Sequence, residues 1–259
     1  DNRNVCVVGD PAQTIYSFAG ASSYDLLAFA DEFRSLSADI RLDTDYRSTP
    51  QVVNYANRVL AASPMRQDYL RLHSAREAGS RVSRKVYETD MLEAQGVASR
   101  IAKLVADGAN PSDCAILTRI NAQQAVCCSA LRAERLGYRV RRDSGWTSSS
   151  PVADLESAGQ LALAEAMREQ GDAAARRLGR VTVSTIHAAK GLEFKHVFVI
   201  GCSEGLLPYG SARQGDELEE ERRLMYVAIT RAEDTLHMSY ARSKDGVGSQ
   251  QRMLSRFLS

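Results

Sequence analysis

The stretch that decides the fold is VTVSTIHAAKGLEFKHVFVI, residues 181–200. Two runs rich in β-branched residues, 181–185 and 197–200, flank a short segment that holds His, Lys, Gly and Glu. Short apolar runs that are bounded by polar or glycine-containing segments are typical of strands buried in a sheet. We therefore expect two buried strands here, joined by a polar connection whose side chains are available for binding.

Outward from this stretch, short apolar runs keep alternating with amphipathic segments. We expect further strands at residues 5–8, 40–42, 83–87, 113–118, 138–141 and 235–240. Apolar residues at helical spacing predict helices at 22–33, 50–61, about 97–107, 122–136, 152–170 and 217–229, with a loop at 63–81 and a linker at 143–151. Alternating strands and helices are typical of βαβ units, so the expected fold class is α/β, with a parallel sheet flanked by helices.

Composition is that of an ordinary globular protein, with 44% hydrophobic and 25% charged residues. The formal net charge is only +1, so bulk charge gives no argument for nucleic-acid binding. No apolar run approaches the roughly 20 residues of a membrane span, and we expect no signal peptide. The five cysteines have no metal-site spacing, which predicts buried free thiols in a reducing cytosol.

The first of four candidate blocks is VVGDPAQTIYSF, residues 7–18. A strand runs into a Gly-Asp turn, after which Gln13 is placed to orient a water or to sense a terminal phosphate. Tyr16 and Phe18 are suited to stack on unpaired bases. The alternative is a simple turn with two core aromatics.

The second block is TDYRSTP, residues 44–50, at an expected helix start. Helix N-termini attract anions, and Arg47 beside one adds a bidentate phosphate donor. Tyr46 offers a ring face for a purine. The alternative is a capped helix with a solvent-exposed arginine.

The third block is the polar connection within residues 183–194. His187 and Lys190 suit backbone phosphates, and Glu193 suits a ribose hydroxyl. A single histidine is more often structural, but the density of polar groups directly after a buried strand favours binding.

The fourth block is DELEEERRLMYVAITR, residues 216–231. Asp216 and Glu219 resemble a capping box, so the carboxylates are expected to serve the helix rather than a metal. Arg231 at the helix exit is placed to act as an arginine finger on a transferring phosphate. Neither a GxxxxGK[ST] phosphate loop nor a DExx-type magnesium motif occurs in the sequence.

Together these blocks resemble motifs III to VI of UvrD/PcrA/Rep-like superfamily-one DNA helicases. VVGDPAQTIYSFAGA resembles motif III, DYRS motif IV, STIHAAKGLEF motif V and EEERRLMYVAITRAED motif VI; CAILTRINAQQ and the terminal SRFL also fit the family. The resemblance covers nearly the whole chain except roughly residues 143–180. It implies a RecA-like, P-loop NTPase-type second motor domain (2A) that lacks the phosphate loop.

The resemblance also implies roles for individual residues. ATP would lie between two RecA-like lobes, with Mg²⁺ held mainly by the other, N-terminal lobe. The residues implied on the nucleotide side are Gln13 at the γ-phosphate, Tyr46 at the adenine, Arg47 and Arg231 at the phosphates, and Gly191 and Glu193. The residues implied to face single-stranded DNA are Tyr16, Phe18, Asn121, His187 and Lys190. Ala19 stands where relatives often carry an arginine, which removes one expected contact.

The expected organisation is a remnant of the first motor domain at 1–36 and the 2A domain at 37–259. A short linker or helical segment at 143–180 would replace the large 2B insertion of relatives. We expect an internal piece of a bacterial-type, cytoplasmic and nucleoid-associated 3′–5′ helicase that acts in DNA repair or replication on single-stranded and partly duplex DNA. The piece alone should lack ATPase activity. The alternatives are the helicase lobe of a recombination helicase–nuclease, or a degenerate lobe that serves as a scaffold for DNA or a partner.

Overall fold

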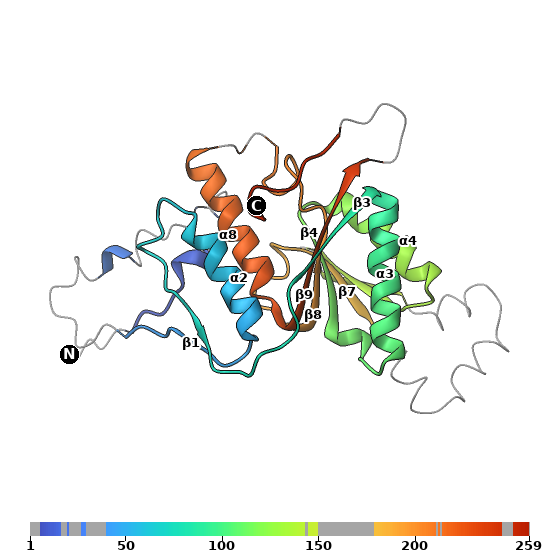
Figure 1. Cartoon of the computed structure of the whole chain (residues 1–259), viewed down its shortest axis with the longest axis horizontal. Coiled ribbons are helices and arrows are strands. Elements are labelled where there is room, and N and C mark those ends of the chain that lie inside the picture. Colours follow the sequence, from blue (N-terminus) through green and yellow to red (C-terminus); the bar gives the residue numbers. More distant parts are fainter. Residues whose placement is uncertain are drawn as a thin grey trace.

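A seven-stranded sheet forms the middle layer of the molecule (Figure 1). The computed structural model describes residues 6–16, 20, 27–29, 40–142, 145–149, 179–210, 212, 214–244 and 251–258. The strand order is β3-β9-β8-β4-β7-β5-β6. The strands are β3 (Ser83–Thr89), β4 (Cys114–Thr118), β5 (Tyr138–Arg142), β6 (Gly145–Ser149), β7 (Val181–Thr185), β8 (Phe194–Val199) and β9 (Ala232–Ser243). All neighbours pair in parallel except β5 and β6, which confirms the predicted RecA-like α/β fold class.

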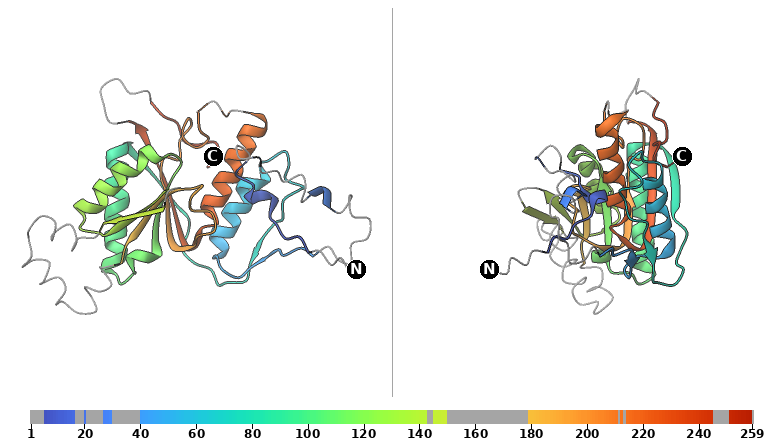
Figure 2. Two further views of the ribbon diagram at one scale, coloured as in Figure 1. Left: turned by 180° about the vertical axis from the view of Figure 1, so that it is seen from behind. Right: turned by 90° about the vertical axis from the view of Figure 1, so that its left-hand side faces the viewer.

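Helices cover both faces of the sheet, as Figures 1 and 2 show. On one face lie α2 (Pro50–Ala61) and α8 (Gly215–Ile229), and on the other lie α3 (Asp90–Ala106) and α4 (Gln124–Ala133). Side chains alternate along the strands, so Val197 and Val199 pack toward α2 and α8 while Phe198 packs toward α3 and α4. Each face therefore buries its own apolar cluster against one helix pair.

Short elements complete the fold. They are the two-stranded sheet of β1 (Thr44–Asp45) and β2 (His73–Ser74), and the 3₁₀ turns η1 (Pro11–Gln13), η3 (Pro111–Asp113) and η4 (Asn121–Gln123). The predicted start of α2 is confirmed: Thr49 is extended and Pro50 occupies the first turn, where its missing N–H has no cost.

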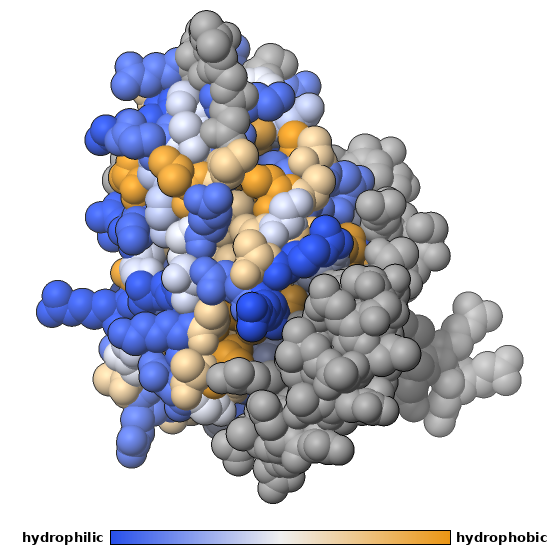
Figure 3. Space-filling model, turned by 90° about the vertical axis from the view of Figure 1, so that its right-hand side faces the viewer, coloured by the Kyte–Doolittle hydropathy of each residue, from blue (hydrophilic) through white to orange (hydrophobic). Residues whose placement is uncertain are grey.

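The outer face of the α3–α4 layer is seen in Figure 3, where apolar surface lies among polar side chains. A hollow there is lined in part by Val86, Leu92 and Ala130. Gly96 is needed beside it, because a Cβ at this position would lie 2.3 Å from Cε1 of Tyr87. The glycine thus lets the aromatic ring of β3 pack directly on the helix.

Several expected elements differ from the structure. Residues 6–8 and 40–42 are irregular rather than strands, because no strand among the described residues pairs with them; Val8 and Ile40 are 81% and 75% exposed. The 145–149 stretch, expected as linker, instead pairs as β6 with the edge of β5. The expected helix at 152–170 lies outside the described residues, as does most of the one at 22–33.

Two side-chain expectations also change. Glu219 does not form a capping box: its carboxylate faces inward, where it bonds Arg222 Nε at 3.1 Å and accepts a hydrogen bond from Ser63. The thiols of Cys114, Cys127 and Cys202 are buried as predicted, whereas Cys6 is exposed and Cys128 half-buried.

Glu93 on α3 makes stability depend on pH. Its carboxylate is 2% exposed and accepts hydrogen bonds from Gly201 N (3.0 Å) and Ser239 Oγ (2.6 Å). Burial raises the pKa of Glu93 from 4.5 to about 7. Since the folded pKa lies above the unfolded one, the stabilising contribution is complete below pH 4.5 and is lost as the pH rises toward 7.

We therefore expect Glu93→Gln to flatten the pH profile of stability. Between pH 5 and pH 8 the native chain should lose about 2 kcal/mol more unfolding free energy than the variant. Urea titrations at both pH values measure this difference. The nearby charged groups Asp90 and Arg252 are unchanged in the variant. If the unfolding free energy changed equally with pH in the two proteins, the raised pKa of Glu93 would be contradicted.

Candidate functional site

The site begins where β8 and β9 start side by side. Phe194 pairs with Ala232, and Phe194 N donates to Arg231 O at 3.0 Å. The residues just before these strands, Glu193 and Arg231, are therefore neighbours at the amino edge of the sheet. This edge lies opposite the carboxyl ends of the strands, where open α/β sheets usually bind ligands.

Arg47 reaches the same point from the turn before α2. Its Nη1 forms an ion pair with Glu193 Oε1, and its Nη2 donates to Thr230 O at 2.8 Å. Asp45 Oδ1 accepts from both Arg47 N (2.7 Å) and Ser48 N (2.9 Å). The Asp45 side chain thus fixes the turn before the helix begins. The backbone of Arg47, from which its side chain extends, is therefore held in one conformation.

Arg231 is held more deeply, with 3% of its surface exposed. Its Nε donates to Val227 O at 3.1 Å, its Nη1 to Leu192 O at 3.1 Å, and its Nη2 to Thr230 Oγ1 at 3.2 Å. Burial, and next the charge of Arg47, lower the pKa of Arg231 to about 10. The group stays cationic at neutral pH. Two guanidinium groups thus lie near one carboxylate: Arg47 pairs with Glu193, and the Glu193 charge also acts on Arg231.

Gln13 joins this region through Asp10. Gln13 Nε2 donates to Asp10 Oδ2 at 2.8 Å, and Asp10 Oδ1 accepts from Ala12 N at 2.9 Å. Asp10 caps η1, whose Ala12 packs in the same apolar cluster as α8, and Arg231 follows that helix. The candidate phosphate sensor and the candidate finger therefore belong to one neighbourhood.

Residues 10–16 are packed into the same core cluster as α8. Ala12 and Ile15 are 1% and 0% exposed, and Arg223 Nε donates to Thr14 O at 2.7 Å. This segment, expected as a remnant of another domain, is bound to the domain described here.

Two further nucleotide-side candidates occupy exposed positions. Tyr46 is 78% exposed beside Arg47. Gly191 has a φ of +85°, a left-handed conformation that favours glycine and lets the chain turn before Glu193.

Three of the DNA-facing candidates form one cluster. The Tyr16 hydroxyl donates to His187 O at 2.8 Å, and the two rings lie 6.0 Å apart. Lys190 Nζ lies 5.2 Å from the Tyr16 ring centroid and donates to Gln13 O at 2.9 Å. Lys190 thus links this cluster to the backbone of the candidate phosphate sensor.

Asn121 lies on a different element from the residues of this cluster. Asn121 is exposed in η4, which follows the carboxyl end of β4. Thr118 pairs with Thr185 at the ends of β4 and β7, so Asn121 and His187 follow adjoining strand ends. Phe18 lies outside the described residues.

The connection 186–193 relates the two groups of residues. It leaves the carboxyl end of β7 and enters the amino end of β8, with β4 between those strands. Ile186 and Ala189 are buried in the α2–α8 cluster, which anchors the connection on that face. One short segment therefore carries Lys190 toward Gln13 and Glu193 toward Arg47.

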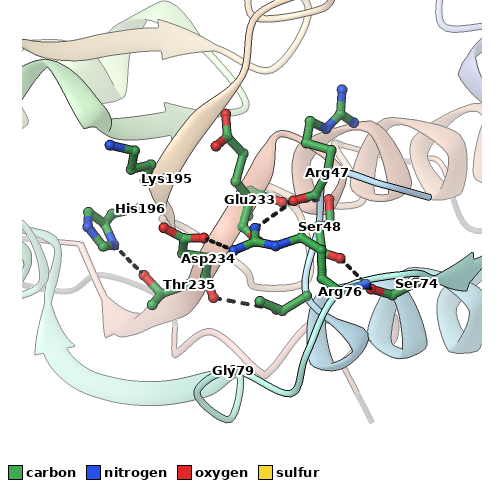
Figure 4. A network of polar contacts seen from close by, with 12 residues as sticks. Arg47, Ser48, Ser74, Arg76, Gly79, Lys195, His196, Glu233, Asp234 and Thr235 are labelled. Carbon is green, nitrogen blue, oxygen red and sulfur yellow. Dashed lines mark hydrogen bonds and ion pairs between the residues drawn. The ribbon is translucent and has the colours of Figure 1, made fainter.

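Sequence reasoning missed Arg76, which Figure 4 shows at the centre of a polar network beside Arg47. Arg76 Nη2 pairs with Asp234 Oδ1 at 2.8 Å, and its Nη1 donates to Arg47 O at 2.6 Å. The residue lies in an irregular segment, where no periodicity or motif could indicate a partner. Asp45 was also missed, although an Asp two residues before an Arg at a helix start is a recognisable turn signal.

The fold is that of a RecA-like α/β lobe, with Arg47, Glu193 and Arg231 gathered at one edge of its sheet. The chain belongs to the UvrD-like helicase C-terminal domain family, which matches residues 40–146 and 152–243. This confirms the family predicted from the four motif blocks.

Curated relatives agree with this family. The chain is 36% identical over 326 aligned positions to the ATP-dependent DNA helicase UvrD2 of Mycobacterium tuberculosis, covering 100% of this chain and 46% of the relative. It is 24% identical to the ATP-dependent DNA helicase PcrA of Staphylococcus epidermidis (99% and 54% covered) and 25% identical to DNA helicase II of Haemophilus influenzae (98% and 54%). The chain spans about half the length of these relatives.

A solved structure supports the fold. The C-terminal domain of a possible DNA helicase from Lactobacillus plantarum superposes with a TM-score of 0.51 at 19% identity, covering 83% of this chain and 92% of that chain. Among the residues that the structure describes, no helix combines the length and apolar character needed to cross a membrane.

Proposed function

We propose that this chain is the second motor domain of an ATP-dependent 3′–5′ DNA helicase that works in DNA repair or replication. The observation that carries the proposal is the convergence of Arg47, Glu193 and Arg231 at the amino ends of β8 and β9. The matching relatives are ATP-dependent DNA helicases, and the proposal extends their activity to the whole protein of which this domain would be part. Work on DNA would place that protein at the nucleoid in the cytoplasm.

The proposed chemistry is electrostatic. Phosphoryl transfer builds up negative charge on the transferring group and the leaving oxygens, and guanidinium groups stabilise it. Arg47, with side-chain exposure of 32%, is the more accessible donor. Arg231 would reach a phosphate by exchanging its bonds to Leu192 O and Thr230 Oγ1.

The other nucleotide-side residues have supporting tasks in the proposal. Tyr46 would stack on the adenine, Glu193 with Gly191 would contact the nucleotide, and Gln13 would sense the γ-phosphate. Mg²⁺ would accompany ATP and be held mainly by the first motor domain, with which this domain would form the ATP cleft. This chain alone would not turn over ATP, because its sequence has no phosphate loop.

Single-stranded DNA would bind along the second cluster. Tyr16 offers a ring for base stacking, and Lys190 and His187 suit backbone phosphates. Since Lys190 Nζ also bonds Gln13 O at 2.9 Å, a change at the γ-phosphate would be passed to the DNA-facing residues. Asn121 and Phe18 would add contacts to the same strand, and the duplex ahead would be the substrate that is opened.

Two alternatives keep the fold and change the role. The domain would serve in a recombination helicase–nuclease if a nuclease module accompanied it, or as a scaffold if the nucleotide site were degenerate. The paired Arg47 and Glu193 and the buried Arg231 favour an intact site, because a scaffold has no use for two converging cations.

Replacing Arg47 by alanine in the full-length helicase tests the proposal. We expect ATP turnover to fall by about 10- to 100-fold, because charge-assisted hydrogen bonds contribute on the order of 1.5–3 kcal/mol each. Steady-state hydrolysis with saturating single-stranded DNA measures the effect. Affinity for DNA should change little, because Arg47 is not part of the Tyr16–Lys190 cluster.

The matched control is Arg58→Ala in the last turn of α2, the helix that follows Arg47. Arg58 lies over the Tyr55 ring at 4.3 Å, away from Glu193 and Arg231, and turnover should stay within about twofold of the native value. Native-like turnover in the Arg47→Ala protein would favour the scaffold alternative.

A further inference from the structure

Arg76 ties together the backbone beside both phosphate-facing arginines (Figure 4). Its Nη1 donates to Arg47 O at 2.6 Å and to Glu233 O at 3.3 Å, and its Nη2 pairs with Asp234 Oδ1 at 2.8 Å. Glu233 and Asp234 follow Arg231 by two and three residues at the start of β9. A single guanidinium group therefore bridges the turn that carries Arg47 and the strand that follows Arg231.

We propose that Arg76 is a positioning residue for Arg47. It holds the Arg47 carbonyl against β9 while Asp45 holds the Arg47 amide, with Asp45 Oδ1 to Arg47 N at 2.7 Å. Both peptide groups of Arg47 are then fixed by charged side chains, which sets the direction of its side chain toward Glu193 and Thr230. The inference rests on the proposed function, since it assigns Arg76 to the same nucleotide site.

The segment that carries Arg76 is anchored independently of it. Residues 74–79, here called the strap, cross the start of α2. At one end Ser74 Oγ donates to Ser48 O at 2.7 Å, and at the other Gly79 N donates to Gln51 Oε1 at 2.8 Å. A Cβ at Gly79 would lie 2.7 Å from Thr49 Cγ2, so the strap runs close against the helix start. The strap should stay in place without the Arg76 side chain.

The shape of the guanidinium group explains why an arginine is needed. Its planar fork bonds two carbonyl oxygens and a carboxylate at once, whereas a lysine ammonium is a compact point charge on a flexible stem. The ion pair is only partly buried, with side-chain exposures of 37% for Arg76 and 34% for Asp234. Solvent screens such a pair, so its contribution to global stability is small and its effect lies in local geometry.

The test is a double-mutant cycle in the full-length helicase, with Arg76→Ala, Arg47→Ala and the double variant. We expect Arg76→Ala to lower kcat/KM for ATP by about 10-fold, to leave the Kd for single-stranded DNA within about twofold, and to leave Tm nearly unchanged. In the Arg47→Ala background the same substitution should cost less than about twofold, because a positioning residue has no effect once the group it positions is gone. Arg76→Lys should restore only part of the loss.

The control is Arg71→Ala, which removes an exposed arginine from the same loop outside the strap. Its kcat/KM should remain native. The inference is overturned if Arg76→Ala costs the same in both backgrounds, if its kcat/KM is native, or if Tm falls in proportion to activity. If Arg47→Ala itself leaves turnover native, the proposed function fails. If Arg47→Ala lowers turnover and Arg76→Ala does not, only the positioning role fails.

Discussion

Replacing Arg231 by lysine in the full-length helicase is expected to lower ATP turnover by about three orders of magnitude, the lower range for loss of an arginine finger. Arg231 uses Nε, Nη1 and Nη2 on three separate oxygens, and a lysine cannot reproduce that fork. The variant keeps the positive charge, so geometry rather than charge is tested. Steady-state hydrolysis at saturating ATP and DNA gives the turnover, and fluorescence anisotropy gives DNA affinity, which should change little.

Arg242→Lys is the matched control for this substitution. Arg242 lies near the other end of β9, exposed and paired with Glu88 at 2.9 Å, and its replacement should leave turnover within about twofold. Thermal unfolding of both variants distinguishes a local defect from loss of the fold. Turnover of the Arg231→Lys protein within threefold of native would remove Arg231 from the reaction.

Removing the Glu221 carboxylate is expected to have the largest effect on stability. Glu221 on α8 is 6% exposed. Its carboxylate accepts hydrogen bonds from Arg119 Nη2 (2.6 Å), Arg119 Nε (3.0 Å) and Tyr209 N (3.0 Å). Glu221→Ala would leave the guanidinium group of Arg119 partly buried and uncompensated, which costs about 3–5 kcal/mol. Urea unfolding of the chain measures the loss.

A double-mutant cycle separates the pair from its surroundings. The Arg119→Ala, Glu221→Ala double variant should be less destabilised than the sum of the single changes, because neither charge is then left alone. Glu217→Ala, an exposed position in the first turn of the same helix, should cost no more than about 1 kcal/mol. If the losses of unfolding free energy in the two single variants add up to the loss in the double variant, Arg119 and Glu221 are not energetically coupled.

The sequence predicted the sheet well because its buried strands can be recognised from their local sequence alone. Residues 114–118 and 181–185 are apolar runs with few alternatives, and their boundaries are nearly those of β4 and β7. The run at 5–8 has the same composition, yet residues 6–8 are exposed and unpaired. Strand formation needs a neighbour, and a local pattern carries no information on whether one is available.

The candidate-site residues that lie in the four motif blocks were predictable from the sequence, and those outside the blocks were not. The order of the four blocks led to Arg47, Glu193 and Arg231, and the structure brings these three together, whereas their catalytic roles stay predictions. Glu219 was assigned to a helix cap from its spacing, but the chain packs that side chain against Arg222 and Ser63. Contacts formed in the folded structure decide where such a side chain lies, and spacing along the sequence does not reveal those contacts.

The connection between β7 and β8 has a mechanical consequence. Only Gly191 and Leu192 separate Lys190, which bonds Gln13 O, from Glu193, which pairs with Arg47. A span this short, with Ala189 buried just before it and Phe194 paired just after it, has almost no slack to absorb a displacement. We therefore expect a displacement of Lys190 to shift Glu193 as well, which would couple the contact with Gln13 to the ion pair with Arg47.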